Sequence, residues 1–430
     1  MNQTATVNPP IKNKTRHKLY ELRNVGRHHT DRSRVRHCGS AVVNGDSAVI
    51  GTREGRVTVY GILSCGSVHE CPTCRARICA ERADEIKKTV KKYREIGGST
   101  YLLTLTIQHA VGDDLKKMRR GIANAWRYVC QGRAWQNFKK QYKISYIRGS
   151  EQTHGRNGWH PHLHVLLLCE SVEFPVESAR AYISERWRSA VLRELGEKHV
   201  PRADKIGIDL RGVDGAQEYI SKLGLEMDQG TARTSAELSS VDSQNDCVSK
   251  LGLEMTQAPT KIAKKHGKTA LQILESIKNS ETDEDKKKYS KLWRAYAKQM
   301  KGARLLTWSR GLKKIAGLTP VADEKIVEKQ DKTLLESVYF HVDRRSWKII
   351  SRDADVTSRW LTEIERVGPE KSLNYLKSLK KSEYYFLANL LQHQLNHKNW
   401  YQLQAESTLT TPRIIKKYTE TGLRASLSPN

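Results

Sequence analysis

The chain has 430 residues, a mean hydropathy of −0.65 and a formal net charge of +28, with 75 lysines and arginines against 47 acidic residues. No apolar run approaches the ~20 residues that cross a bilayer, and the N-terminal stretch has no apolar export signal. These features exclude a membrane protein and predict a cytoplasmic one. The length corresponds to about two or three domains. The spread of basic residues favours a nucleic-acid partner, because cations displace the counterions of phosphates; a basic surface that meets only water is the alternative.

Residues 1–36 are polar and basic without any period, which predicts a flexible basic arm. Residues 37–97 contain five of the cysteines, with short strand and turn patterns between them. A helix is expected from about residue 80 to the glycine pair at 97–98. This stretch therefore predicts a small zinc-binding module with a connecting helix.

Four cysteines of this module predict one tetrahedral zinc site. Cys71 and Cys74 have the C-x-x-C spacing in which a tight turn points two thiolates at one metal. Cys38 and Cys65 each open a CGS string and complete the four ligands. Cys79, His37 and His69 are reserve ligands, whereas Cys130, Cys169 and Cys247 are scattered. Free thiols or a redox pair are the alternatives, but a redox pair needs no further cysteines nearby.

Strand and helix patterns alternate over residues 98–227. Strands are predicted at 100–110, 143–155, 159–169 and 206–213, and helices at 113–141 and 175–195. The pattern predicts an α+β domain with a central antiparallel sheet and flanking helices. Residues 228–258 are polar and read as an inserted loop, and residues 259–430 form a mostly helical basic region.

Three histidines alternate in GWHPHLHVLLL, residues 158–168. Side chains alternate across a strand, so His160, His162 and His164 share one face. A lone buried histidine is usually a hydrogen-bonded core residue, but rings at period two converge on one point and are typical of metal ligands. Glu151, on the strand expected to pair with this one, supplies a carboxylate.

A metal in a strongly basic protein favours phosphodiester chemistry, in which the ion polarises the scissile phosphate. The nucleophile is predicted in DGAQEYISKLGLEM, residues 214–227. If this stretch is helical, Tyr219, Lys222 and Glu226 line one face. A lysine and a metal favour the phenolate of a nearby tyrosine. An ordinary amphipathic helix is the alternative.

Three segments, TLTIQH (104–109), GWHPHLHVLLL (158–168) and EYISK (218–222), resemble in order and spacing the motifs of the HUH single-strand endonucleases. Within that superfamily the chain is similar to plasmid rolling-circle replication initiators of the Rep_1 type. The resemblance covers most of residues 36–320 and includes LLTWSRGLKKIAGL (305–318). It implies an HUH endonuclease domain at residues 98–227.

The resemblance also implies roles for single residues. His162 and His164 would bind Mg²⁺ or Mn²⁺, and Glu151 is the third ligand by strand adjacency, with His160 and His109 beside the ligands. Tyr219 would attack the origin phosphate and keep the 5′ end, leaving a 3′-OH as primer, and Lys222 would assist. The partners implied are plasmid origin DNA, single-stranded at the nick, and the host replicative helicase, single-strand-binding protein and DNA polymerase.

The chain departs from this pattern at two places. Initiators of this type commonly carry a glutamate four residues before the tyrosine, but Gly215 stands there, so Asp214 or Glu218 is left to activate water. The string EYISKLGLEM (218–227) is nearly repeated as DCVSKLGLEM (246–255), with a cysteine in place of the tyrosine. The repeat predicts a single-tyrosine enzyme, and the second copy could displace the first from its site.

Two other functions remain open from the sequence. A related HUH transposase or relaxase is less consistent with the position of the single tyrosine, which follows the histidines. A non-catalytic zinc-dependent DNA-binding regulator explains the charge and the cysteines but assigns no role to the histidine strand or to the Tyr-x-x-Lys string.

Overall fold

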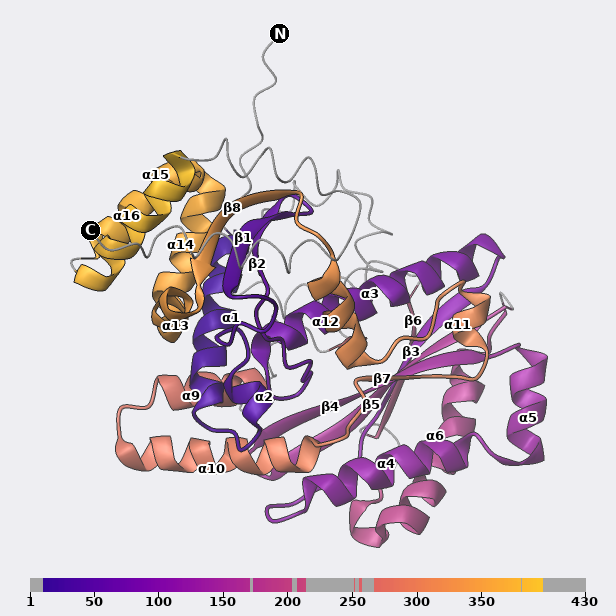
Figure 1. Cartoon of the computed structure of the whole chain (residues 1–430). Helices are drawn as coiled ribbons and strands as arrows, with labels where there is room; N and C mark the ends of the chain where they lie inside the picture. Colours follow the sequence, from indigo (N-terminus) through magenta and orange to yellow (C-terminus); the bar gives the residue numbers. More distant parts are fainter. Residues whose placement is uncertain are drawn as a thin grey trace, which may run out of the picture. The chain divides into compact units, whose positions relative to one another are not determined.

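The computed structural model describes residues 11–170, 173–202, 207–213, 251, 255–256, 267–379 and 381–396 (Figure 1). The chain divides into two compact units, Met1–Cys74 with Val327–Asn430, and Arg75–Ile326. In these described ranges, no helix is long and apolar enough to cross a membrane.

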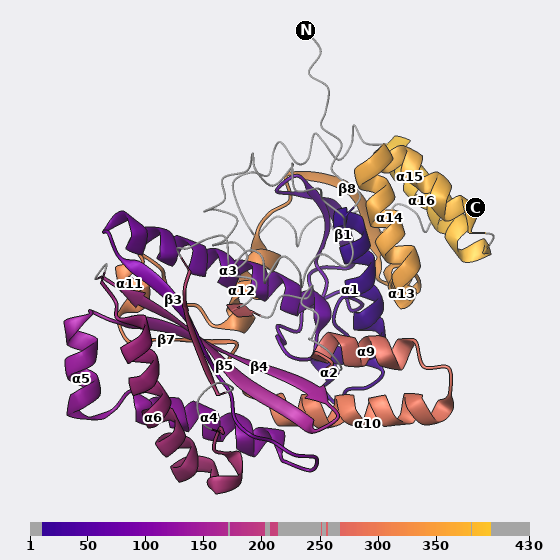
Figure 2. The same cartoon turned by 180° about the vertical axis from the view of Figure 1, so that it is seen from behind.

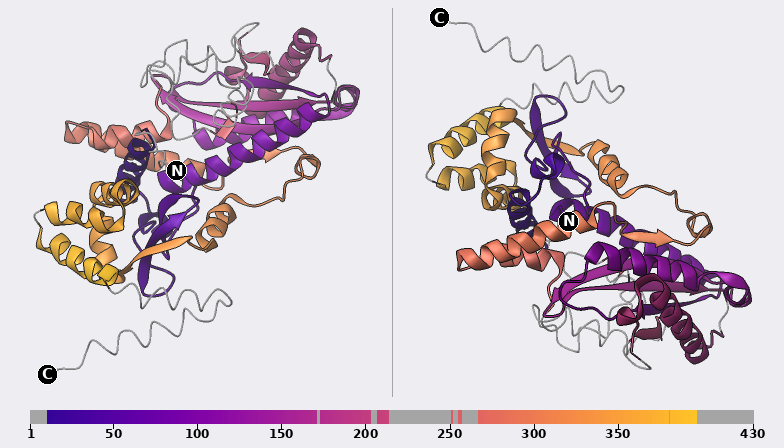
Figure 3. Two further views of the ribbon diagram at one scale, coloured as in Figure 1. Left: turned by 90° about the horizontal axis from the view of Figure 1, so that it is seen from above. Right: turned by 90° about the horizontal axis from the view of Figure 1, so that it is seen from below.

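The first unit is built on a three-stranded antiparallel sheet with the order β2-β1-β8. Its strands are β1 (Ser47–Arg53), β2 (Arg56–Tyr60) and β8 (Ser337–Asp343). The first two form a hairpin whose turn places Glu54 and Gly55 at φ 52° and 67°. In Figure 3 the orange strand β8 runs beside this indigo hairpin, so segments far apart in the sequence share one sheet.

Helices from both ends of the chain complete this unit. They are α1 (Ile11–Arg27), α2 (Ser33–Arg36), α13 (Arg344–Arg352), α14 (Ala354–Val367), α15 (Pro369–Ser378) and α16 (Ser382–Asn396). Large side chains from the strands and the late helices form the core, with Phe340, Trp347 and Trp360 at most 1% exposed. Burial of such aromatic side chains is the main stabilising contribution available to a unit of this size.

The prediction of a flexible arm at residues 1–36 is wrong for its described part, because α1 occupies most of it. Leu22 is 1% exposed and Tyr20 packs against the aromatic core. Arg16 donates a hydrogen bond to Glu365 of α14 at 2.6 Å. The many basic residues of α1 make its short apolar stripe hard to recognise in the sequence. The residues that stabilise α1 lie more than 300 positions away in the chain.

The second unit contains a five-stranded antiparallel sheet with the order β6-β3-β5-β4-β7. Its strands are β3 (Ser99–Leu105), β4 (Ser145–Gly155), β5 (Gly158–Cys169), β6 (Ile208–Gly212) and β7 (Leu306–Trp308). The predicted α+β class and the antiparallel sheet with flanking helices are therefore confirmed. The central strand β5 is buried along its apolar half, as expected for a strand covered on both faces.

Helices cover both faces of this sheet. The helices between residues 72 and 332 are α3 (Pro72–Glu95), α4 (Leu115–Val129), α5 (Gly132–Gln141), α6 (Val176–Leu195), α9 (Ala270–Lys278), α10 (Asp283–Met300), α11 (Leu312–Ile315) and α12 (Asp323–Lys332), with a 3₁₀ turn at Glu197–His199. Figures 1 and 2 show α4 and α6 on one side of the strands and α3 on the other.

Two predicted helices have different bounds in the structure. The stretch 113–141 forms two helices, α4 and α5, and the Asp114 side chain caps α4 by accepting from Lys117 N at 2.6 Å. The helix expected from residue 80 begins at Pro72, where a proline loses no intrahelical hydrogen bond. The mostly helical region 259–430 also contains β7 and β8, which are short edge strands whose sheet partners lie far earlier in the sequence.

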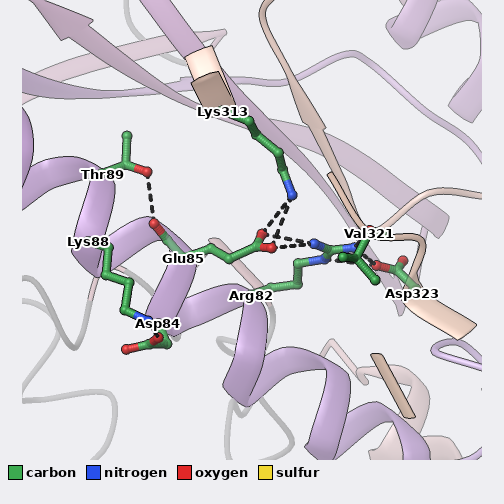
Figure 4. A network of polar contacts seen from close by, with 8 residues as sticks. All are labelled: Arg82, Asp84, Glu85, Lys88, Thr89, Lys313, Val321 and Asp323. Carbon is green, nitrogen blue, oxygen red and sulfur yellow. Dashed lines mark hydrogen bonds and ion pairs between the residues drawn. The ribbon is translucent and has the colours of Figure 1, made fainter. Parts of the chain in front are cut away.

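A buried ion network fixes residues 312–323 to α3 (Figure 4). Arg82 contacts Glu85 on the same helix at 2.8 Å and Asp323 at 2.7 Å. Lys313 of α11 reaches Glu85 at 3.0 Å. Removing one member would leave a buried charge without its partner, which is strongly destabilising. The network therefore holds the segment after β7 in one position.

Candidate metal centre and its surroundings

Two neighbouring strands, β4 and β5, bring the predicted ligands to one face of the five-stranded sheet, and β3 adds Thr104 beside them. In the β4–β5 ladder Glu151 lies directly opposite His162, and in the β3–β5 ladder Thr104 lies opposite His164. Residues paired in this way point to the same side of a sheet. Arg148, three residues before the glutamate, points to the other face and donates to Ala123 O of α4 at 3.1 Å. The ligands thus occupy the face turned away from α4.

The three ligand atoms form a nearly equilateral triangle. His162 Nε2 lies 3.1 Å from Glu151 Oε2 and 3.1 Å from His164 Nε2, and the third side is 3.2 Å. A cation about 2.1 Å from three neighbouring octahedral ligands requires these ligands to be about 3.0 Å apart. One carboxylate and two imidazoles also form the donor set of divalent-cation sites with open positions. The residues present therefore fit a divalent metal ion.

The ligand side chains are held before any metal arrives. Glu151 and His164 are buried, at 3% and 6% exposed, within the sheet. The hydroxyl of Thr104 lies 3.2 Å from His164 Nδ1, which leaves Nε2 of the same ring for the metal. Sequence reasoning missed this role of Thr104, although the residue opens the TLTIQH string. Thr104 could have been identified by its position opposite His164 in the neighbouring strand, but this requires knowledge of the β3–β5 register.

His160 and His109 lie beside the ligand cluster without joining it. Their rings stack with centroids 4.6 Å apart and planes 6° apart. The His160 ring is also 5.2 Å from the His162 ring. Burial, together with the neighbouring histidines, lowers the pKa of His160 to about 4. Burial likewise lowers the pKa of His109.

His109 does not lie on a strand, contrary to the prediction of a strand at 100–110. Strand β3 ends at Leu105, and the next residues form a loop that is fixed by hydrogen bonds. Gln108 N donates to His199 O at 3.0 Å, and the ring of His199 lies 2.9 Å from Gln108 O through Nδ1. Ala110 N donates to Asp113 at 2.8 Å. The backbone amides of this loop form hydrogen bonds outside the sheet. The residue pattern of the sequence therefore could not show that β3 ends at Leu105.

The proposed nucleophile and its helpers, Tyr219, Lys222, Asp214 and Glu218, lie outside the described residues, as does Cys247. The second repeat copy is described at two positions, Leu251 and Met255, and the residue that follows it, Thr256, is also described. Leu251, Met255 and Thr256 are at most 1% exposed.

This repeat copy meets the sheet at Gly149, which faces the same side as Glu151. A Cβ built on Gly149 would lie 2.6 Å from Met255 O, so only glycine allows this approach. Thr256 O accepts a hydrogen bond from Cys79 Sγ at 3.2 Å. The string SKLGLEM, which occurs in both copies, therefore ends in the second copy against the metal-bearing face of the sheet.

A second candidate metal site lies in the first unit, where Cys38, Cys65, Cys71 and Cys74 converge. The thiol of Cys38 is 3.6 Å from both Cys71 and Cys74, and Cys65 is 3.7 Å from Cys74. A tetrahedral zinc with Zn–S bonds of about 2.3 Å requires sulfur atoms about 3.8 Å apart. All four cysteines are buried, and the geometry fits one zinc ion.

The backbone around these thiols is shaped for a metal. Gly39 and Gly66, which follow Cys38 and Cys65, have φ of 75° and 68°. Ser67 N donates to Cys65 Sγ at 3.4 Å. Such turns with amides aimed at sulfur stabilise thiolates. The two CGS strings thus form matching turns, as their repetition in the sequence predicted.

Electrostatics also favour a cation among the four thiols. Hydrogen bonds from Cys38 and the other thiols hold the pKa of Cys71 well below its usual range. Hydrogen bonding to Cys38 and Cys71, together with burial, raises the pKa of Cys74 well above it. One thiolate therefore suppresses ionisation of its neighbours unless a positive ion joins them. Buried Arg27, which donates to Cys38 O at 3.1 Å, adds positive charge at this place.

The reserve zinc ligands lie elsewhere. Cys79 is buried within α3, where burial raises the pKa of its thiol, and it is not part of the four-cysteine group. His37 is exposed and its Nδ1 contacts Ser33 O at 3.0 Å. Burial raises the pKa values of Cys130 and Cys169 to about 12, so neither is a ready thiolate.

Comparison with known proteins places these features in a family context. The model of the replication protein family Rep_1 matches residues 59–202, which include both the ligand triangle and Cys65, Cys71 and Cys74. A protein named "Protein rep" from Streptomyces lividans is 24% identical over 329 residues, covering 62% of this chain and 66% of that protein. A "Neomycin resistance protein" from Streptomyces cyanogenus is 28% identical over 143 residues, covering 27% of this chain and 33% of that protein.

The chain thus spans less than two thirds of the length of either relative. No solved structure matches the chain. The matching family model describes a replication protein, and the segment that carries Glu151, His162 and His164 lies inside the matched region. Residues 59–202 are thus similar to the Rep_1 replication proteins, and this match includes two of the three motifs, TLTIQH and GWHPHLHVLLL, whereas EYISK lies outside it.

Proposed function

We propose that this protein initiates rolling-circle plasmid replication by nicking and rejoining one DNA strand at the origin. The observation that carries the proposal is the triangle of Glu151, His162 and His164, whose ligand atoms are 3.1–3.2 Å apart within the matched family region. The net charge of +28 suits a DNA substrate. Within this proposal the second unit is an HUH endonuclease domain, and the four cysteines hold a structural zinc.

Mg²⁺ or Mn²⁺ bound by the triangle would withdraw charge from a scissile phosphate oxygen. The protein's part is to hold the ligands in place. Glu151 and His162 face each other across the β4–β5 ladder, and Thr104 fixes the ring of His164. His162 Nδ1 is buried and has no hydrogen-bond partner among the described residues.

The proposed covalent step uses Tyr219. Its phenol oxygen bonds to the scissile phosphorus, the bond to the 3′ oxygen breaks, and the phenolic proton is balanced by the proton gained at the new 3′-OH. Lys222, three residues later, stabilises the phenolate and the attacked phosphate. Asp214 or Glu218 activates water or the incoming strand at termination, since Gly215 cannot. After the initial nick, the 3′-OH primes synthesis by the host polymerase, with the host helicase and single-strand-binding protein as further partners.

The test uses the full-length protein, Mn²⁺ and 3′-labelled single-stranded oligonucleotides that tile the replicon carrying the gene. The wild type and Cys247→Ala should give a covalent protein–DNA band on a denaturing gel, because the label stays with the captured 5′ end. Tyr219→Phe should give none. A band from the Phe variant would move the nucleophile to another residue.

The non-catalytic regulator makes the opposite prediction. His162→Ala should abolish nicking and leave duplex binding largely intact, whereas His154→Ala is the matched control. His154 lies on β4 of the same hairpin, but its ring packs on Trp159 on the opposite face, at 4.8 Å between centroids. A wild-type protein that binds duplex DNA and Mn²⁺ yet nicks no oligonucleotide would favour the regulator.

A further inference from the structure

Four imidazole rings form a continuous row that begins at the ligand triangle. From His164 to His162 to His160 to His109 the ring centroids are 4.8, 5.2 and 4.6 Å apart. The first two rings hold the metal in the proposed function. The last two belong to no group of ligand atoms within the described residues that could hold an ion. They extend the row away from the buried end of the sheet.

The outer pair has the geometry of a stacking surface. The His109 and His160 planes differ by 6°, whereas the two ligand rings are at 82° to each other. Ligand rings turn their edges toward a shared point, because the nitrogen lone pairs lie in the ring plane. Parallel rings present their faces instead, and aromatic faces bind nucleobases by stacking.

The outer end of the row is fixed in advance. The loop that carries His109 is hydrogen-bonded on both sides of it, through Gln108 to His199 and through Ala110 to Asp113. Trp187 Nε1 donates to Thr106 O at 2.9 Å and fixes the start of the loop. A surface held in this way loses little conformational entropy on binding.

The surroundings of this end suit a single DNA strand. Val111 is 76% exposed next to the row, and Arg156 is exposed in the β4–β5 turn. Turn and loop touch, since a Cβ on Gly158 would lie 3.3 Å from Val111 Cα. A basic side chain beside aromatic rings is the usual composition of single-strand sites, in which bases stack and phosphates meet cations.

We propose that a nucleobase next to the scissile phosphate stacks on His109, the outer ring of this row, which His160 supports from behind, while Arg156 meets the backbone. The proposal rests on the proposed function for its substrate. It assigns the two histidines to binding of the strand, with no part in holding the metal.

The experiment compares two 20-nucleotide single strands in the presence of Mn²⁺, one of mixed sequence and one fully abasic with the same phosphates. Fluorescence anisotropy measures the affinity of the full-length protein for each. The wild type should bind the normal strand more tightly. His109→Ala removes the stacking face and His160→Ala removes the ring that supports it. Each should weaken binding of the normal strand by about tenfold and leave binding of the abasic strand unchanged.

Phenylalanine variants separate stacking from nitrogen chemistry. His109→Phe and His160→Phe keep an aromatic face and should bind the normal strand like the wild type, and calorimetry should give an unchanged Mn²⁺ affinity. His154→Ala, on the opposite face of the hairpin, is the control. Loss of Mn²⁺ binding in the Phe variants would overturn the proposal and make these rings ligands.

Equal binding of normal and abasic strands by the wild type would also overturn the stacking proposal. That result leaves the proposed function intact if the same protein still forms the covalent adduct. A protein that forms no adduct but prefers the normal strand would instead refute the nicking function and keep the stacking surface.

Discussion

Single contacts decide the chemistry of the ligand triangle. Its three ligand atoms are 3.1–3.2 Å apart, and one hydroxyl, that of Thr104, contacts Nδ1 of His164 and so orients its ring. The partners that orient metal ligands commonly change metal affinity by about 10- to 100-fold when they are removed. The site is therefore sensitive to side chains that never touch the ion.

Replacement of Thr104 tests this sensitivity. Thr104→Val keeps the shape and removes the hydroxyl, so we expect Mn²⁺ to bind about 10- to 100-fold more weakly in isothermal titration. Thr104→Ser keeps the hydroxyl and should restore most of the affinity. A valine variant that binds Mn²⁺ like the wild type would show that the hydroxyl does not position His164.

Removal of one cysteine tests the zinc site. The wild type should contain about one zinc per chain by elemental analysis. Cys71→Ser should lose it and melt at a lower temperature, because metal binding contributes directly to the stability of such modules. Cys130→Ser, which replaces a cysteine outside the cluster, should retain the zinc and the melting temperature of the wild type. Zinc retained at full stoichiometry in Cys71→Ser would contradict the four-cysteine assignment.

Elements were predictable from the sequence where their pattern is local. β4 and β5 lie within two residues of the predicted strands because the alternation in SYIRGSEQTHG and GWHPHLHVLLLC is complete within each strand. The register that sets Glu151 opposite His162 follows from the short turn between them. The helix α1 and the strands β7 and β8 were missed because their partners are remote, so their own residues carry only weak patterns.

The repeated string gives a prediction at the scale of elements. SKLGLEM occurs at 221–227 and 249–255, and the second copy buries Leu251 and Met255. Deletion of residues 228–255 joins the first copy to Thr256 and supplies the same leucine and methionine. We expect this deletion to keep the melting temperature and to increase the yield of covalent adduct, because no copy with a cysteine then competes. Leu251→Ala in the full chain is a comparison that removes the buried side chain.

A clear drop in the melting temperature of the deletion variant, measured by circular dichroism, would contradict this equivalence of the two copies. An unchanged adduct yield with an unchanged melting temperature would show that the second copy does not compete with the first.

Charge acts at the scale of the whole molecule. With a net charge of +28 the protein should bind DNA through many phosphate contacts, each of which releases counterions. We expect the logarithm of the affinity for duplex DNA to fall linearly with the logarithm of the salt concentration, with a slope of about −0.9 per phosphate contacted. Anisotropy titrations between low and physiological salt measure it, and a slope near zero would exclude an electrostatic origin of binding.

The fixed loop before α4 has a consequence for amide exchange. The amides of Thr106, Gln108 and Ala110 donate to Gly207 O, His199 O and Asp113. Although they lie beyond the end of β3, their protons should exchange with deuterium slowly in the free protein, at rates nearer those of a strand than of an open loop. Rapid exchange that slows only when DNA is added would mean that the bound DNA strand orders this loop of the protein.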